Sequence, residues 1–235
     1  IIRQFLRQVP HHVSAMQLLA DIGLRLGVLD DAEFLLEAAT RFEPDNVLVR
    51  VDYIQALRKR QKFHDALAQA KRLLDGDPDS LKFRSIYAVE CMQTGDYDEA
   101  LRVFDQILVQ APHDPVTLTS KGHALKTQGR YQDAVESYRA ALSSHPQYGE
   151  AYYSLANLKV YSFSEEELQN MRTQCDNADL SYTDRVYLNF ALGKACEDVD
   201  DYSEAFQRYR LGNVLKKSQS RYDADDMSAD MAAQR

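Results

Sequence analysis

The chain has 235 residues, of which 45% are hydrophobic and 27% are charged, and its formal net charge is −8. This composition is ordinary for a soluble globular protein, and the acidic balance argues against a nucleic-acid-binding domain, which would carry a basic face. No apolar run approaches the roughly 20 residues of a membrane span, and the three cysteines are isolated, so we expect reduced thiols and a cytoplasmic location.

A constant spacing of 34 residues runs through the chain as far as residue 148. Prolines fall at positions 10, 44, 78, 112 and 146, and alanines fall at positions 32, 66, 100 and 134. A fixed period of this length indicates a repeat architecture. It predicts four blocks, with residues 1–12 as the end of a preceding block; the four blocks are residues 13–46, 47–80, 81–114 and 115–148.

Each block is expected to hold two helices joined by a tight turn. Apolar residues recur at the three- and four-residue spacing of a helix, as in Leu101, Phe104, Ile107 and Leu108. Gly95 and Gly129 suit the left-handed conformation that ends a first helix, and Asp98 is expected to cap the second helix that follows Gly95. The proline of each block cannot continue a helix and marks the second end.

The pattern changes after residue 148. Leu168 stands where the next alanine is due. Ser164 and the three glutamates after it predict a helix start, so we expect a helix over about residues 165–176 and a loop over residues 177–184. A repeat-like block resumes near residue 186. The expected segments are an irregular fifth unit at 149–185, a diverged repeat at 186–219 and a linker helix at 220–235.

The four blocks resemble the tetratricopeptide repeat (TPR). Small residues stand where the two helices of a block would approach each other, and Leu29, Phe63, Tyr97 and Tyr131 share one packing column. The resemblance implies an all-α fold, a TPR α-solenoid in which antiparallel helix pairs stack into a right-handed superhelix. It also implies a concave groove that binds a protein or peptide.

Several stretches are also similar to bacterial TPR-containing sulfotransferases. This resemblance implies that a catalytic domain, which uses phosphoadenosine phosphosulfate (PAPS), follows the array in the parent protein. The chain itself has no Pro-Arg-Ser-Gly run and no glycine-rich phosphate loop. We therefore expect no catalytic residue, cofactor-binding residue or metal ligand in this chain, and PAPS only in the missing domain. The similar stretches are residues 122–130, 153–168, 184–198, 202–213 and 221–225.

The TPR resemblance turns one face of each first helix toward the concave groove. Helical spacing alone places these residues on a common face. Their methionine, tyrosine and amide groups suit an extended peptide, although a solvated face shaped only by solubility is the alternative. Capture of a C-terminal carboxylate is not expected, because only Asn157 matches the Lys and Asn pattern of TPR domains that do so. The candidate groove residues are Gln17, Asp21, Arg25, Val51, Gln55, Arg58, Lys59, Ser85, Val89, Met92, Gln93, Thr119, His123, Lys126, Thr127, Tyr153, Asn157 and Tyr161.

Three other features have a structural alternative to a functional role. The basic cluster of Arg58, Lys59, Arg60 and Lys62 suits either an acidic ligand segment or a solvated helix end. The six histidines show no ligand spacing, so turn polarity explains them better than a metal. The acidic runs at residues 165–167 and 223–226 are interpreted as helix starts, not as paired catalytic carboxylates.

The sequence thus predicts a non-catalytic module that binds protein or presents a substrate within a PAPS-dependent sulfotransferase. Its expected partners are a protein or peptide ligand and its own C-terminal sulfotransferase domain, with no nucleic acid and no membrane. Two alternatives stay open. One is a stand-alone TPR scaffold that assembles complexes, and the other is the TPR array of another transferase, such as a glycosyltransferase.

Overall fold

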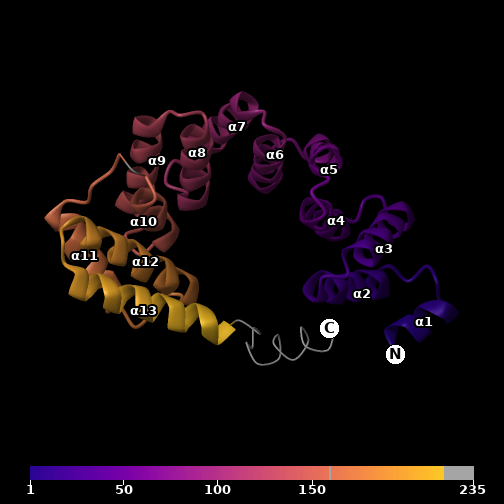
Figure 1. Ribbon diagram of the computed structural model, residues 1–235. Coiled ribbons are helices and arrows are strands. Elements are labelled where there is room, and N and C mark those ends of the chain that lie inside the picture. The colour runs from indigo at the N-terminus through magenta and orange to yellow at the C-terminus, as the bar shows by residue number, and fades with distance from the viewer. Residues whose placement is uncertain (159, 220–235) are drawn as a thin grey trace, which may run out of the picture. The chain divides into compact units, whose positions relative to one another are not determined.

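The computed structural model describes residues 1–158 and 160–219, and every regular element among these residues is a helix (Figure 1). The all-α prediction is therefore confirmed. The chain divides into two compact units, Ile1–Pro112 and His113–Arg235, each with its own set of packed helices. Among the described residues, no helix combines the length and the hydropathy that a membrane crossing needs. The linker helix predicted at 220–235 lies outside the described residues.

The first unit is a row of helices in which each helix packs on the next one along the chain. The turns between the helices are short, so neighbouring helices run antiparallel (Figure 1). Each of its three sequence blocks holds one helix pair, namely α2 with α3, α4 with α5, and α6 with α7. The helices are α1 (Ile2–Gln8), α2 (Val13–Leu26), α3 (Leu29–Phe42), α4 (Val47–Lys59), α5 (Phe63–Gly76), α6 (Leu81–Thr94) and α7 (Tyr97–Gln110).

The turn inside each block needs one left-handed residue. Gly95 ends α6 at φ 87° and confirms the role predicted for it, and Gly27 ends α2 in the same way at φ 78°. Gln61 fills this place after α4 at φ 60°, a conformation that costs a residue with a Cβ atom. The predicted cap of α7 is wrong: Asp96, not Asp98, accepts the hydrogen bond from the Glu99 amide, because the turn after Gly95 is only one residue long.

Small residues let the two helices of a pair approach closely. Ala32, Ala66 and Ala100, at the same place in successive blocks, have no exposed surface. At the first of these contacts, a Cβ atom added to Gly23 of α2 would lie 3.3 Å from the Cβ atom of Ala32 on α3. Such packing has no room for a larger side chain. The alanine column read from the sequence is therefore the contact line of each helix pair.

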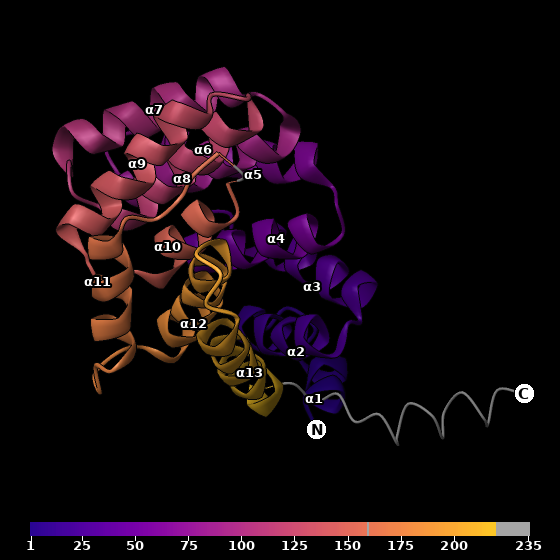
Figure 2. The same cartoon turned by 60° about the vertical axis from the view of Figure 1, so that its left-hand side comes forward.

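The second unit begins with one regular helix pair and continues with a different arrangement. Helix α10 packs on α9 and on α12, whereas α11 packs on α12. Helices α12 and α13 lie side by side in both views (Figures 1 and 2). The helix that follows α10 along the chain is therefore not its main neighbour. The helices are α8 (Pro115–Thr127), α9 (Tyr131–Ser144), α10 (Gly149–Ala156), α11 (Glu165–Cys175), α12 (Tyr182–Asp198) and α13 (Tyr202–Gln219).

The start of α10 is fixed to the start of α12. The Gly149 amide donates a hydrogen bond to Oδ1 of Asp184 at 2.9 Å. A Cβ atom on Gly149 would lie 2.5 Å from the Asp184 carbonyl oxygen, so only glycine permits this approach. The predicted loop at 177–184 is too long, because Ser181 caps α12 by accepting from the Asp184 amide.

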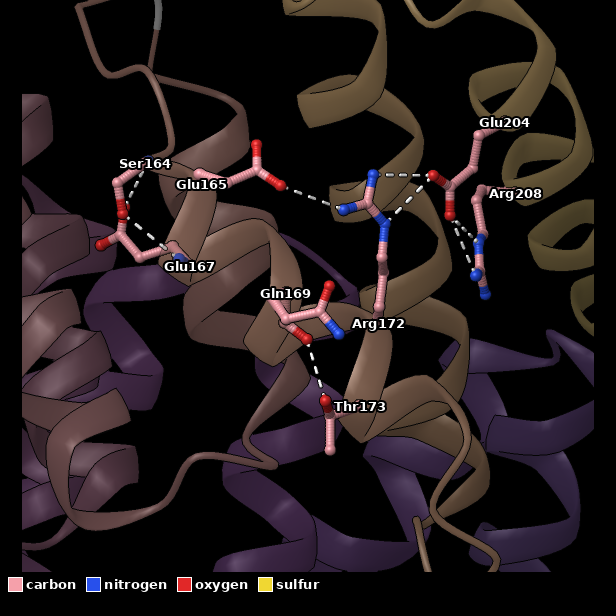
Figure 3. A network of polar contacts seen from close by, with 8 residues as sticks. All are labelled: Ser164, Glu165, Glu167, Gln169, Arg172, Thr173, Glu204 and Arg208. Carbon is pink, nitrogen blue, oxygen red and sulfur yellow. Dashed lines mark hydrogen bonds and ion pairs between the residues drawn. The ribbon is translucent and has the colours of Figure 1, made fainter.

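Helix α11 begins as predicted and is tied to α13 by ion pairs. Ser164 and Glu167 form a capping box, in which each side chain accepts from the other residue's amide (Figure 3). Arg172 reaches across to α13, where its Nη2 lies 2.9 Å from Oε2 of Glu204. The other carboxylate oxygen of Glu204 lies 3.1 Å from Arg208. The Glu204 carboxylate thus joins α13 to α11 through Arg172, and Arg208 on α13 itself binds its second oxygen.

The left-handed turn gives the first testable prediction. Gln61→Gly should raise the free energy of unfolding by about 0.5–1 kcal/mol, because glycine adopts a positive φ without steric cost and this gain exceeds its extra unfolded-state entropy. Urea denaturation followed by circular dichroism measures the change. Lys62→Gly, one residue later at φ −87°, should instead lower stability, because glycine relieves no backbone strain there and the ion pair of Lys62 with Glu33 is lost. A Gln61→Gly variant as destabilised as Lys62→Gly would contradict the explanation.

The ion pairs of Glu204 give a pH-dependent prediction. Hydrogen bonds from Arg172 and then from Arg208 hold the pKa of Glu204 below its usual range, against the effect of burial. This stabilisation is present above the unfolded pKa of about 4.3 and is lost as pH falls through the folded value. Glu204→Gln should therefore cost about 1–2 kcal/mol at neutral pH and much less in acid.

Denaturation curves at about pH 7 and about pH 3 test this pH dependence. Glu165→Gln is the matched control, because the Glu165 side chain is 85% exposed and lies 3.6 Å from Arg172. It should change stability little at either pH. An equal deficit of Glu204→Gln in both buffers would show that the carboxylate acts through packing and not through charge.

Candidate functional site

The candidate groove residues of the first unit lie on α2, α4 and α6, and several of them hold neighbouring helices together. Gln17 donates to Oδ2 of Asp52 at 2.6 Å, which joins α2 to α4. Lys59 donates to the Leu24 carbonyl at 3.1 Å across the same two helices. Arg58 donates through Nε to the fully buried Glu90 at 3.0 Å and joins α4 to α6. These polar side chains stabilise the stacking of first helices.

The remaining candidates of this unit differ in accessibility. Asp21 and Arg25 form an ion pair at 3.0 Å along α2. Gln55 and Gln93 are exposed, and the rest are partly buried; these are Val51, Ser85, Val89 and Met92. This face is available to a ligand only where the side chains are not already bound to a neighbouring helix.

The basic cluster at the end of α4 is largely paired with acidic residues of α3. The Arg60 guanidinium lies 3.2 Å from Glu33 and also pairs with Asp30. Lys62 lies 2.6 Å from Glu33. Much of the cluster's charge is therefore balanced within the unit, which leaves less of it for an acidic ligand segment.

Four candidate residues of the second unit meet in one hollow of about 450 Å³ between α8, α10 and α12. His123 and Lys126 come from α8, and Tyr153 and Asn157 come from the end of α10. We call this the α8–α10–α12 hollow. Its other lining residues were not among the candidates; they are Glu150, Ser154 and Tyr187.

The other three candidates of the second unit do not line this hollow. Thr119 is only 1% exposed, so it belongs to the interior. The Thr127 hydroxyl donates to the His123 carbonyl at 2.9 Å on its own helix. Tyr161 lies against Phe163, with ring centroids 5.0 Å apart, and its hydroxyl donates to Glu167 at 2.5 Å. Tyr161 therefore supports the start of α11 instead of extending the hollow.

One wall of the hollow is aromatic. Tyr153 is 37% exposed, and its ring lies 5.2 Å from Tyr187 and 6.4 Å from Phe190, both on α12. Burial and then the charge of Glu150 raise the pKa of Tyr187, so its hydroxyl stays a hydrogen-bond donor. Aromatic rings with one wet edge supply a large contact area together with a polar group.

The opposite side of the hollow carries a chain of polar contacts. The Tyr138 hydroxyl lies 2.9 Å from Nδ1 of His123, and Nε2 of His123 lies 3.6 Å from Oε1 of Glu150. Tyr148 donates to Oε2 of Glu150 at 3.0 Å. The contacts with His123 and then Tyr148 hold the pKa of Glu150 below its usual range, although burial acts against them. Glu150 is therefore an ionised acceptor with a fixed orientation.

This polar chain depends on a glycine in α8. A Cβ atom on Gly122 would lie 2.4 Å from the Tyr138 ring. The ring of Tyr138, which has no exposed surface, therefore lies directly on the α8 backbone, and its hydroxyl reaches His123. The pair recurs at the end of the unit, where a Cβ atom on Gly193 would lie 2.8 Å from the Tyr209 ring.

Two family models match the chain. One, described as tetratricopeptide repeat, covers residues 54–115, and another, described as TPR repeat, covers residues 122–160. The fold is an all-α solenoid of tetratricopeptide repeats. Repeats of this kind indicate a protein-interaction module, so the α8–α10–α12 hollow lies in a scaffold suited to binding other proteins.

Solved structures show the same fold. A tetratricopeptide repeat protein from Parabacteroides merdae is 20% identical, with a TM-score of 0.53 over 88% of this chain and 86% of that chain. MamA from Desulfovibrio magneticus RS-1, residues 41 to the end, is 15% identical, with a TM-score of 0.51 over 88% of this chain and 97% of that chain. At these identities the likeness concerns the fold alone.

Curated relatives share the repeats within much longer proteins. The human protein O-mannosyl-transferase TMTC1 is 23% identical over 157 residues, which are 65% of this chain and 18% of that protein. The probable UDP-N-acetylglucosamine–peptide N-acetylglucosaminyltransferase SPINDLY of Arabidopsis thaliana is 33% identical over 107 residues, which are 45% of this chain and 12% of that protein. The chain thus matches less than a fifth of either relative's length.

The contact of Tyr138 with α8 gives a prediction for the site. Gly122→Ala should lower the free energy of unfolding by about 1–3 kcal/mol, because the Tyr138 ring must move away from the added methyl group. The same movement should break the hydrogen bond to His123. Thermal unfolding measures the first effect, and the ¹H–¹⁵N spectrum of the His123 imidazole reports the second.

Gly76→Ala is the control for this substitution. A Cβ atom at Gly76 meets nothing within 4 Å, so this variant should be neutral or slightly stabilising. If the Gly122→Ala variant has the unfolding temperature of the wild type and an unchanged His123 spectrum, the Tyr138 ring does not position His123.

Proposed function

We propose that this chain is the non-catalytic, protein-binding part of a larger transferase and that the α8–α10–α12 hollow binds a short extended segment of a partner or substrate protein. The exposed Tyr153 ring beside Lys126 and Asn157 carries the proposal. A ring face takes an apolar or aromatic side chain, and the ammonium and amide groups bind the polar backbone on either side. The ionised Glu150 accepts a backbone amide at the same place.

The parent in this proposal is a PAPS-dependent sulfotransferase. The stretches at 153–168, 184–198 and 202–213 resemble that family, and they form the irregular part of the second unit. In this arrangement PAPS binds in a further domain, and the present chain supplies neither catalytic residues nor cofactor contacts. The hollow then binds the protein that accepts the sulfate, or a protein that delivers this acceptor, and holds it for the catalytic domain.

A glycosyltransferase parent is the second candidate. It is favoured by one observation, the 33% identity with SPINDLY over 107 residues, since the printed name of that protein assigns it a sugar-transfer activity. TMTC1 is likewise named as a mannosyl-transferase. A stand-alone scaffold has the same binding surface but no transferase attached. The three parents differ in the chemistry of the rest of the protein and not in the hollow.

The proposed location is the cytoplasm. Cys91, Cys175 and Cys196 are all buried and unpaired, as expected of a protein in a reducing compartment. Burial raises the pKa of Cys91 and that of Cys196 to about 11, so both thiols stay protonated and unreactive at neutral pH.

A peptide-display selection against the chain tests the binding function. Tyr153→Ala should weaken the selected peptides about tenfold or more, because it removes the exposed ring of the hollow. Tyr131→Ala is the matched control, since Tyr131 is also an exposed ring, at 46%, but lies outside the hollow. Tyr153→Ala also removes the ring contacts with Tyr187 and Phe190 and should melt at a lower temperature, so binding is compared at a temperature at which both variants are folded. Peptides that lose equal affinity for both variants, or for neither, would place the binding surface elsewhere.

Donor chemistry is tested separately. Calorimetry of this chain with PAPS should give no heat, and micromolar binding would contradict the assignment of the donor site to another domain. The parent protein should transfer sulfate from PAPS and not sugar from a nucleotide sugar. The opposite result would select the glycosyltransferase parent, and the absence of both activities would favour the scaffold.

A further inference from the structure

A different hollow lies entirely within the first unit, where the turn before α4 meets the end of α5 and the start of α6. Its volume is about 540 Å³. Arg50 of α4 and Arg72 of α5 both line it, beside Val47, Leu73 and Phe83. We call it the Arg50 pocket. None of its residues is a candidate groove residue, and none belongs to the α8–α10–α12 hollow.

Arg50 is a buried cation that no carboxylate contacts. It is 9% exposed, and its guanidinium donates to Oε1 of Gln69 at 2.6 Å and to the Pro44 carbonyl. Both acceptors are neutral. Among the described residues, no Asp or Glu oxygen comes within 4.0 Å of it. A guanidinium has five N–H donors, so hydrogen bonds to two acceptors leave capacity for a further one. Buried charges in proteins are normally paired.

The next repeat shows how the same arginine is balanced elsewhere. Arg84 stands 34 residues after Arg50 and donates to the Pro78 carbonyl at 2.8 Å, as Arg50 does to that of Pro44. Arg84 also pairs with Asp79 at 3.3 Å. Asp45 occupies the position equivalent to Asp79 but makes no such contact with Arg50. Both arginines bind the carbonyl of the repeat proline, and this contact explains why an arginine stands at each position. Only Arg84 also has a carboxylate partner, so the charge of Arg50 has no direct counterion.

A second cation increases the imbalance. Arg72 is exposed, and within the described part of the chain it has no hydrogen bond or ion pair. Burial and then the like charge of Arg72 lower the pKa of Arg50, while the charge of Asp45 acts in the opposite direction. The guanidinium groups of Arg50 and Arg72 therefore repel each other in the Arg50 pocket, which both residues line. An anion bound between them would offset this repulsion.

The remaining lining selects the kind of anion. Val47, Leu73 and Phe83 give the pocket an apolar side, and the carboxylates of Asp45 and Asp77 also line it. With two positive and two negative groups around the pocket, the net attraction for an anion is small, so the larger desolvation cost of a doubly charged phosphate favours a singly charged carboxylate. Guanidinium groups bind carboxylates with two parallel hydrogen bonds.

We propose that the Arg50 pocket binds a carboxylate with an apolar body, the carboxylate between Arg50 and Arg72 and the body against Val47, Leu73 and Phe83. A free small acid and an acidic side chain beside an apolar residue in a peptide share this chemistry. The site is independent of the α8–α10–α12 hollow, so this proposal goes beyond the function proposed for that hollow.

An NMR titration of the whole chain tests the proposal. N-acetyl-phenylalanine represents the free acid, and its neutral amide is the control ligand. We expect saturable shifts of the Leu73, Gly76 and Phe83 amide signals at millimolar acid, which is weak binding appropriate to a small probe. The neutral amide should cause none. Equal shifts with the acid and its neutral amide would overturn the proposal. It would also be overturned if neither the acid nor an acidic peptide caused a saturable shift.

The blocked peptide acetyl-Gly-Phe-Glu-Gly-amide represents the second source of the carboxylate. It offers the same two groups inside a peptide, with no free terminus. Tighter binding of this peptide than of the free acid assigns the pocket to a protein partner, and the reverse order assigns it to a small acid. Either order supports the carboxylate chemistry. Inorganic phosphate should bind more weakly than both, and preferential binding of phosphate would overturn the choice of anion.

Matched variants locate the effect. Arg72→Gln should weaken the acid about tenfold without lowering the unfolding temperature, because Arg72 makes no contact that stabilises the fold and its charge only repels Arg50. Lys71→Gln removes a neighbouring exposed charge and should bind as the wild type does. Asp45→Asn should bind the acid more tightly, a gain that misfolding cannot produce. Equal affinity of Arg72→Gln and wild type would refute the site.

Discussion

The close contact of two helices at a small residue is the constraint on which the rest of this structure depends. Ala32, Ala66 and Ala100 have no exposed surface, so each helix pair meets with its backbones near each other. Between successive pairs, polar side chains of the first helices reach one another, as Gln17 on α2 reaches Asp52 on α4. In the second unit Gly122 serves the same purpose and brings Tyr138 within 2.9 Å of His123. Repeat packing and site geometry therefore have one cause.

The polar residues of the repeats divide between holding helices and offering a surface. Arg58 and Arg50 occupy the same helix, yet one is bound to the buried Glu90 and the other lacks a carboxylate partner. Arg58 is paired because the next repeat supplies Glu90, and Arg84, the equivalent of Arg50 one period later, is paired with Asp79 of its own turn. In a repeat protein each surface residue has a close equivalent one period away, so the equivalent that is paired shows what the unpaired one lacks.

Local patterns in the sequence predicted the local structure well. The helix pairs, the turn at Gly95 and the capping box at Ser164 follow from short-range backbone rules. Contacts between repeats did not follow, because spacing places Lys59 on a face but cannot show that it reaches the Leu24 carbonyl. Two residues of the α8–α10–α12 hollow could have been found: Glu150 precedes Tyr153 at helical spacing, and Tyr187 follows Tyr153 by 34 residues. The 34-residue spacing of Tyr153 and Tyr187 is hard to recognise in the sequence, because the additional helix α11 lies between them.

The pairing of Gly149 with Asp184 joins two points of the chain that are 35 residues apart in sequence. Once α10 and α12 are fixed together there, the polypeptide between Asn157 and Ser181 is a side branch of the helix stack. Its outer surface can change without moving Tyr153 relative to Tyr187, whereas α11 itself is held by its packing on α12 and by the ion pair of Arg172 with Glu204 on α13. The outer surface of this branch and the geometry of the α8–α10–α12 hollow can therefore change independently.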